Sequence, residues 1–120
     1  MSPRNRRIAF WALTGLVAVP NALAGLGYLS GADEVLANFT RLGFPLYVAT
    51  LLGVWKLLGA TALLTRKVPR LTEWAYAGYG FVLSGAAVSH LAAGDPIATA
   101  VPPLVMLGFL IGSYRLQPQT

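Results

Sequence analysis

Four long apolar stretches, separated by short polar segments, dominate the sequence. They cover residues 8–29, 45–64, 74–91 and 97–114. A helix needs about 20 mostly apolar residues to cross a bilayer, and the last two stretches are near the lower limit. The pattern therefore predicts an all-α, integral membrane four-helix bundle that forms a single domain over residues 1–120.

The connections between these stretches indicate how the helices run. Residues 92–96, Ala-Ala-Gly-Asp-Pro, have the composition of a tight turn. Short connections place neighbouring helices antiparallel, which predicts an up-down-up-down bundle. The longer segment before the second stretch is expected to contain a short helix over about 32–41 that lies on the membrane surface.

The basic residues predict the orientation, because Lys and Arg in short loops mark the cytoplasmic side. Seven of them fall at the two ends of the chain and in the connection between the second and third stretches. These are Arg4, Arg6, Arg7, Arg66, Lys67, Arg70 and Arg115. The other two connections contain a single basic residue, Arg41. Both termini are therefore expected in the cytoplasm.

Composition excludes several classes of protein. The chain is 56% hydrophobic and 11% charged, with a mean hydropathy of +0.62, whereas soluble domains have about 25% charged residues. The net charge of +5 does not indicate nucleic-acid binding, because the basic residues form short clusters between apolar runs, as expected beside an anionic leaflet. The absence of cysteine excludes disulfides, thiol catalysis and iron–sulfur clusters.

Polar residues inside the apolar stretches are the candidate functional groups, since ionisable side chains are costly in a membrane. Lys56 lies about 15 Å from the cytoplasmic end of its stretch, at 1.5 Å per residue. Asn21, which follows the helix-perturbing Pro20, is expected at the depth of Ser89 and His90. A purely structural role remains open for Lys56 and for His90, as a salt bridge or a carbonyl contact.

These residues predict a polar site inside the bundle. Asn21, Lys56, Ser84 and His90 would line an interior of ligand size, and Tyr76 lies on the helical face that leads to Ser84 and His90. Glu73 begins the third stretch, where the helix dipole favours a carboxylate. With one histidine and no cysteine, no metal site is expected within one copy of the chain.

Several segments resemble the DoxX-like family of small four-helix bacterial membrane proteins. The resemblance extends over about residues 25–114 and rests on the patterns LGxxKLLGA, LxEWAYAG and SHxxxGDP. These begin at Leu52, Leu71 and Ser89, respectively. The resemblance implies a location in the bacterial inner membrane. The polar signature positions of the family match Lys56, Glu73, Ser89, His90 and Asp95.

The resemblance implies a link to membrane redox complexes, because the family takes its name from a subunit of a thiosulfate:quinone oxidoreductase. Our leading hypothesis is a membrane-embedded subunit that binds a small lipophilic ligand, with a quinone as one candidate. The protein would act with a redox partner or as a homo-oligomer. Nucleic acid is not expected as a partner.

Two alternatives remain. In the first, the protein is an enzyme that acts on a lipophilic substrate, with His90 as general acid or base and Lys56 as the electrostatic stabiliser of an oxyanion. Asp95 would then lie beside the catalytic histidine. In the second, the protein is a small oligomeric transporter. Small multidrug exporters share this size, but they use a carboxylate in the first span, and residues 8–29 contain none.

Overall fold

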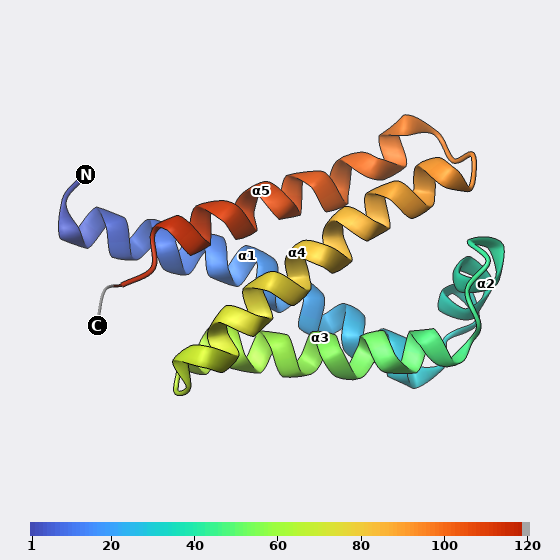
Figure 1. Cartoon of the computed structure of the whole chain (residues 1–120), viewed down its shortest axis with the longest axis horizontal. Helices are drawn as coiled ribbons and strands as arrows, with labels where there is room; N and C mark the ends of the chain where they lie inside the picture. The colour runs from blue at the N-terminus through green and yellow to red at the C-terminus, as the bar shows by residue number, and fades with distance from the viewer. Residues whose placement is uncertain (119–120) are drawn as a thin grey trace.

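The computed structural model describes residues 1–118 and is all-α over this range (Figure 1). It contains five α-helices and one short 3-10 helix within these residues. Their bounds are α1 Pro3–Ser30, α2 Asp33–Arg41, α3 Tyr47–Thr65, α4 Pro69–Ala92, η1 Ile97–Ala100 and α5 Val101–Arg115. The predicted short helix in the first connection is confirmed as α2.

Local sequence accounts for several helix ends. The side chain of Ser2 accepts a hydrogen bond from the backbone N–H of Asn5 (3.1 Å), and Pro3 occupies the first turn, where it needs no N–H partner. Gly31 ends α1 with a φ of +72°, a left-handed conformation that costs glycine little. Gly94 has a φ of +80° in the turn between α4 and η1. The left-handed conformations of Gly31 and Gly94 allow the chain to change direction within a few residues after α1 and after α4.

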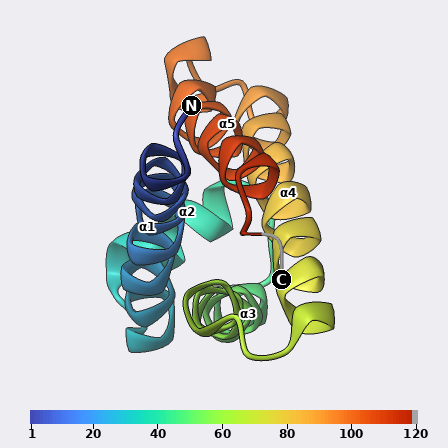
Figure 2. The same ribbon diagram turned by 90° about the vertical axis from the view of Figure 1, so that its left-hand side faces the viewer.

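The four long helices form a ring in which each helix packs against two others (Figure 2). Helix α1 contacts α3 and α5, and α4 contacts the same two helices. Within residues 1–118, the diagonal pairs α1–α4 and α3–α5 do not come within 8 Å between Cα atoms. The core of the ring consists of Val17, Leu63, Tyr76, Tyr79, Leu83 and Leu110.

The N-terminus, residues 116–118 after α5, and the turn between α3 and α4 lie at one end of the molecule, whereas α2 lies near the other (Figure 1). We call these the terminal end and the α2 end. Hydrogen bonds hold the terminal end together: Arg6 Nη2 donates to the carbonyl of Arg115 (2.9 Å), and Arg66 Nη2 donates to Oε1 of Gln117 (2.6 Å). The predicted up-down course of the long helices therefore brings the basic segments to a single end.

Three segments are long and apolar enough to cross a membrane: α1, α3 and Ile97–Arg115, which joins η1 to α5. Many large apolar side chains on the outside of the helices are exposed, such as Leu23, Leu58 and Phe81. Such a surface requires an apolar environment. The chain is thus a multi-pass membrane protein.

Helix α4 differs from the prediction in extent and composition. It has 24 residues and begins at Pro69, five residues before the predicted stretch at 74–91. It is long enough to span a bilayer, but it is not among the sufficiently apolar segments, because glycine, tyrosine, serine and histidine residues lower the hydropathy even of its charge-free part, residues 74–92. The crossing of a fourth helix and the orientation of the termini remain predictions.

Candidate functional site

Lys56 is buried in the interior of the bundle, where it bonds to Asn21. Its side chain belongs to α3 and is 7% exposed. The amine Nζ donates to Oδ1 of Asn21 on α1 (2.5 Å) and lies 5.7 Å from the centroid of the Tyr28 ring. Asn21 Nδ2 in turn donates to the carbonyl of Val17 (2.7 Å) and contacts Sδ of Met106 on α5 (3.1 Å). The pair therefore connects three helices.

The charge of Lys56 has no acidic counterpart in the described part of the chain, where no carboxylate lies within 4.0 Å of its amine. An ammonium group has three N–H donors, and Asn21 accepts from one of them. The face of the Tyr28 ring stabilises the cation through its quadrupole. A side-chain amide oxygen and an aromatic ring thus take the place of the salt bridge or backbone-carbonyl contact that a structural role for Lys56 would involve.

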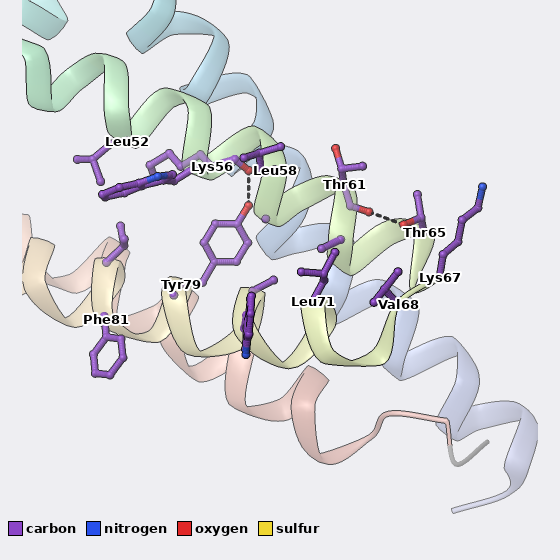
Figure 3. A pocket seen from close by; sticks show the side chains of 17 residues that line it. Leu52, Lys56, Leu58, Thr61, Thr65, Lys67, Val68, Leu71, Tyr79 and Phe81 are labelled. Atoms are coloured by element: carbon purple, nitrogen blue, oxygen red, sulfur yellow. Dashed lines mark hydrogen bonds between the residues drawn. The ribbon is translucent and has the colours of Figure 1, made fainter.

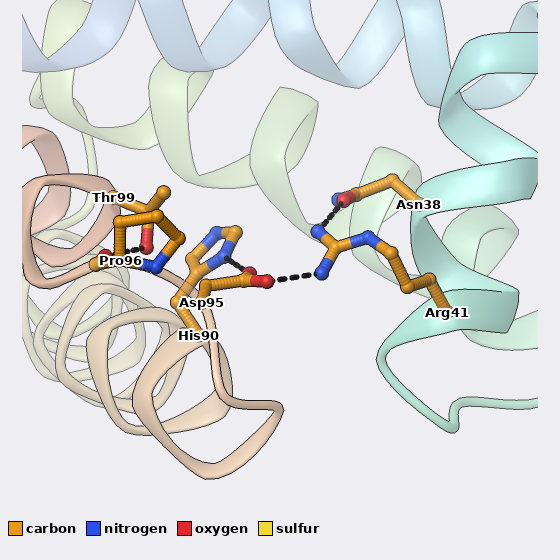
Figure 4. A network of polar contacts seen from close by, with 6 residues as sticks. All are labelled: Asn38, Arg41, His90, Asp95, Pro96 and Thr99. Carbon is orange, nitrogen blue, oxygen red and sulfur yellow. Dashed lines mark hydrogen bonds and ion pairs between the residues drawn. The ribbon is translucent and has the colours of Figure 1, made fainter.

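A second polar group lies at the α2 end, around Asp95 (Figure 4). Nδ1 of His90 lies 2.7 Å from Oδ2 of Asp95, and Arg41 of α2 forms an ion pair with the other carboxylate oxygen. Arg41 Nη2 also donates to Oδ1 of Asn38 (2.8 Å). These contacts connect α2 to the turn that follows α4. They lower the pKa of Asp95, chiefly through the hydrogen bond from His90 and then through Arg41.

This arrangement orients the imidazole of His90. An ionised carboxylate can only accept hydrogen bonds, so Nδ1 of His90 carries a proton and donates a hydrogen bond to Asp95. Within residues 1–118, Nε2 makes no hydrogen bond. A carboxylate-oriented imidazole can transfer a proton or anchor a polar group, but within residues 1–118 no serine or threonine hydroxyl forms a hydrogen bond with it.

A third polar group, near the terminal end, was not predicted as a unit. Thr14 Oγ1 and Ser113 Oγ are 2.7 Å apart, and Ser113 Oγ lies 2.8 Å from the hydroxyl of Tyr76. Beside them, Tyr114 donates to Oε2 of Glu73 (3.1 Å). Thr14 and Ser113 are hydroxyl residues inside apolar stretches, a signal that could have identified them.

The eight predicted site residues therefore do not line one pocket. Asn21 and Lys56 lie together, His90 and Asp95 lie together, and Tyr76 and Glu73 belong to the terminal-end group. Ser84 Oγ donates to the carbonyl of Gly80 in its own helix (2.8 Å), and Ser89 is half-buried. No hydrogen bond or ion pair between side chains in residues 1–118 connects the Lys56 pair with the Asp95 group.

An apolar groove between α3 and α4 is a feature that the sequence analysis missed (Figure 3). Its volume is about 660 Å³. The residues that line it are Leu52, Trp55, Lys56, Leu58, Gly59, Thr61, Ala62, Thr65, Lys67, Val68, Leu71, Trp74, Ala75, Gly78, Tyr79, Phe81 and Val82. Their chemistry does not distinguish them from residues that face lipid, so the sequence contains no clear signal for the groove.

The floor of the groove is formed where α3 and α4 approach each other. The Tyr79 hydroxyl donates to the backbone carbonyl of Lys56 (2.6 Å). A Cβ at Gly59 would lie 2.9 Å from Cζ of Tyr79, so only glycine leaves room for this ring. Lys56 contributes to the wall, but its amine is directed to Asn21 on α1. The groove and the buried amine are therefore on different sides of α3.

Comparison with known proteins assigns the family. No curated protein and no solved structure matches the chain significantly. The model of the DoxX-like family matches residues 12–113, which include all four long helices in large part and both α2 and η1. The match covers most of the chain, and the chain therefore belongs to the DoxX-like family.

Proposed function

We propose that this protein binds a small lipophilic ligand within the membrane, in the groove between α3 and α4. The observation that carries the proposal is the groove itself. Its volume of about 660 Å³ falls within the range of about 300–1,000 Å³ that is typical of small-molecule sites. Its walls are mostly aliphatic and aromatic, with Trp55, Trp74 and Phe81 among the large side chains.

The groove suits an elongated apolar molecule. It follows α3 and α4 lengthwise, so that Leu52 and Phe81 lie at one end and Lys67 and Val68 at the other (Figure 3). Burial of the apolar surfaces of ligand and groove favours binding by about 25 cal/mol per Å² removed from water. In a bilayer this term is small, so shape and the few polar groups determine which molecule is retained.

Quinones belong to this class of ligand, and binding of a quinone would support a role as accessory subunit of a redox complex in the bacterial inner membrane. In this proposal, the Lys56–Asn21 pair has a supporting role. It attaches α1 to the far side of α3 and leaves the Lys56 carbonyl to hold Tyr79 at the floor of the groove.

A pair of glycine variants tests the proposal. Gly78 lines the groove, and a Cβ there would meet no atom within 4 Å, so Gly78→Phe should fill the groove without a clash in the backbone. Gly85 lies two turns further along the same helix, is equally unobstructed and does not line the groove, which makes Gly85→Phe the matched control.

The readout is the set of lipophilic molecules that remain with the detergent-washed protein, extracted into organic solvent and quantified by mass spectrometry. We expect one lipophilic molecule to be present at about one equivalent per protein in the wild type and in Gly85→Phe. In Gly78→Phe its amount should be at least tenfold lower. Equal amounts in the two variants would contradict binding in the groove.

A further inference from the structure

We infer that the ligand of the α3–α4 groove is an anionic phospholipid from the leaflet at the terminal end, with one acyl chain in the groove and its acidic headgroup beside Lys67. The inference rests on the proposed function and specifies its ligand. It is supported by the distribution of polar groups along the groove, by the length of the groove, and by the charge of the α3–α4 turn.

The threonines and the amine of Lys67 gather at one end of the groove, whereas the Lys56 amine and the Tyr79 hydroxyl are already bonded to Asn21 and to the Lys56 carbonyl. Thr65 and Lys67 lie beside the α3–α4 turn, with Thr61 one turn of α3 away. The opposite end is lined by Leu52 and Phe81 (Figure 3). An amphiphile with one polar head and a long apolar chain matches this gradient, whereas a compact neutral ring would leave the cationic end without a partner.

The length of the groove fits a chain that crosses one leaflet. Leu52 and Thr65 are 13 residues apart on α3, or about 20 Å at 1.5 Å per residue. The hydrocarbon core of a bilayer is about 30 Å thick, so one leaflet contributes about 15 Å. An acyl chain of a leaflet lipid that starts at the interface beside the turn therefore fills about three quarters of the groove.

The positive charge of Lys67 favours a lipid with an anionic headgroup. Lys67 lines the groove, and no carboxylate in residues 1–118 forms an ion pair with it. Arg66 is directed elsewhere, because its guanidinium carbon lies 4.8 Å from the Phe10 ring centroid and Nη2 binds Gln117. Glu73, the nearest carboxylate in the sequence, lies on the α4–α5 side, where it accepts from Tyr114.

Two native tryptophans allow a direct test. Trp55 and Trp74 line the groove, and Trp11 on α1 is the third tryptophan of the chain. We would reconstitute the full-length Trp11→Phe protein in vesicles of equal parts phosphatidylglycerol and phosphatidylcholine. One of the two lipids would carry brominated acyl chains, which quench tryptophan fluorescence on contact.

We expect brominated phosphatidylglycerol to quench more strongly than brominated phosphatidylcholine, with a preference of about fivefold, the size of the attraction of one basic residue to an anionic membrane surface. Lys67→Gln should abolish most of the preference. Arg70→Gln, which removes the same charge from the adjoining first turn of α4 at a residue that does not line the groove, should retain it.

The inference is overturned if the two lipids quench equally in the Trp11→Phe protein, or if Lys67→Gln and Arg70→Gln lower the preference to the same extent, as diffuse surface attraction predicts. The proposed function survives either result if Gly78→Phe still loses a neutral lipophilic molecule that Gly85→Phe retains. If the glycine variants also behave alike, both proposals fail.

Discussion

At the scale of single residues, the interior of the bundle stabilises a lysine with very few contacts. Its amine has one amide oxygen and one aromatic face as neighbours in the described residues. A buried charge without a partner is strongly unfavourable, so removal of the single acceptor should affect the fold more than removal of the charge itself.

A double-mutant cycle measures this dependence. We expect Asn21→Leu to lower the free energy of unfolding by about 2–3 kcal/mol more in the wild type than in a Lys56→Met background, since hydrogen bonds to charged groups contribute about 1.5–3 kcal/mol. The contacts of Asn21 with Val17 and Met106 are lost in both backgrounds and cancel. Reversible unfolding in mixed detergent micelles provides the measurement, and equal costs in the two backgrounds would contradict the coupling.

Asp95 predicts a dependence of stability on acid pH. Its pKa is lowered in the folded protein, first by His90 and then by Arg41. A carboxylate of this kind contributes stability above its unfolded pKa of about 3.9, and the contribution is lost as pH falls through the folded value. We therefore expect the melting temperature of the wild type to fall more steeply below about pH 4 than that of Asp95→Asn. Parallel acid profiles for the two proteins would show that the Asp95 group does not stabilise the fold.

At the scale of helices, glycine determines how closely α1 and α3 approach. A Cβ on Gly25 would lie 2.9 Å from the backbone oxygen of Gly53, and a Cβ on Gly53 would lie 2.9 Å from Cγ of Leu29. The first of these clashes involves backbone, so it cannot be relieved by a change of rotamer. Small residues at helix contacts are a general means of close packing in membranes.

We expect Gly25→Ala to separate α1 from α3 and to destabilise the protein by about 1–3 kcal/mol, the usual cost of overpacking. Gly15→Ala is the matched control on the same helix, because a Cβ there meets no atom within 4 Å. It should be neutral or stabilising by up to about 1 kcal/mol, since alanine favours helix over glycine. Thermal unfolding of both variants in one detergent distinguishes these outcomes, and a similar melting temperature for the two would refute the role of Gly25.

At the scale of the whole molecule, the fold collects the basic segments at the terminal end. The bonds from Arg6 to Arg115 and from Arg66 to Gln117 show this directly. The α2 end contains Arg41, which Asp95 neutralises. This asymmetry is the arrangement that the positive-inside rule associates with a cytoplasmic terminal end.

The prediction for topology is four crossings with both termini in the cytoplasm. Reporter fusions at the N-terminus and the C-terminus should both be active on the cytoplasmic side of intact cells. Labelling of a C-terminal tag from outside would rule out this arrangement, and would indicate that α4, the least apolar long helix, does not cross the membrane.

The sequence by itself determined the features that depend on local composition. Hydrophobicity along the chain located α1, α3 and the segment Ile97–Arg115, since the cost of burying backbone and polar groups in lipid acts on every residue of a span. The sequence also predicted α2. It identified Lys56 as an ionisable residue inside an apolar stretch, where a charge is costly. His90 and Asp95 are five residues apart across one short turn, so their pairing follows from local geometry.

Tertiary structure decided the rest. Asn21 binds Lys56 because Gly25 and Gly53 allow α1 and α3 to approach closely, and Arg41 reaches Asp95 because α2 lies near the turn after α4. The α3–α4 groove depends on the angle and spacing of two helices. Its apolar side chains have the same chemistry as those that face lipid, so hydrophobicity alone cannot distinguish a groove wall from the outer surface.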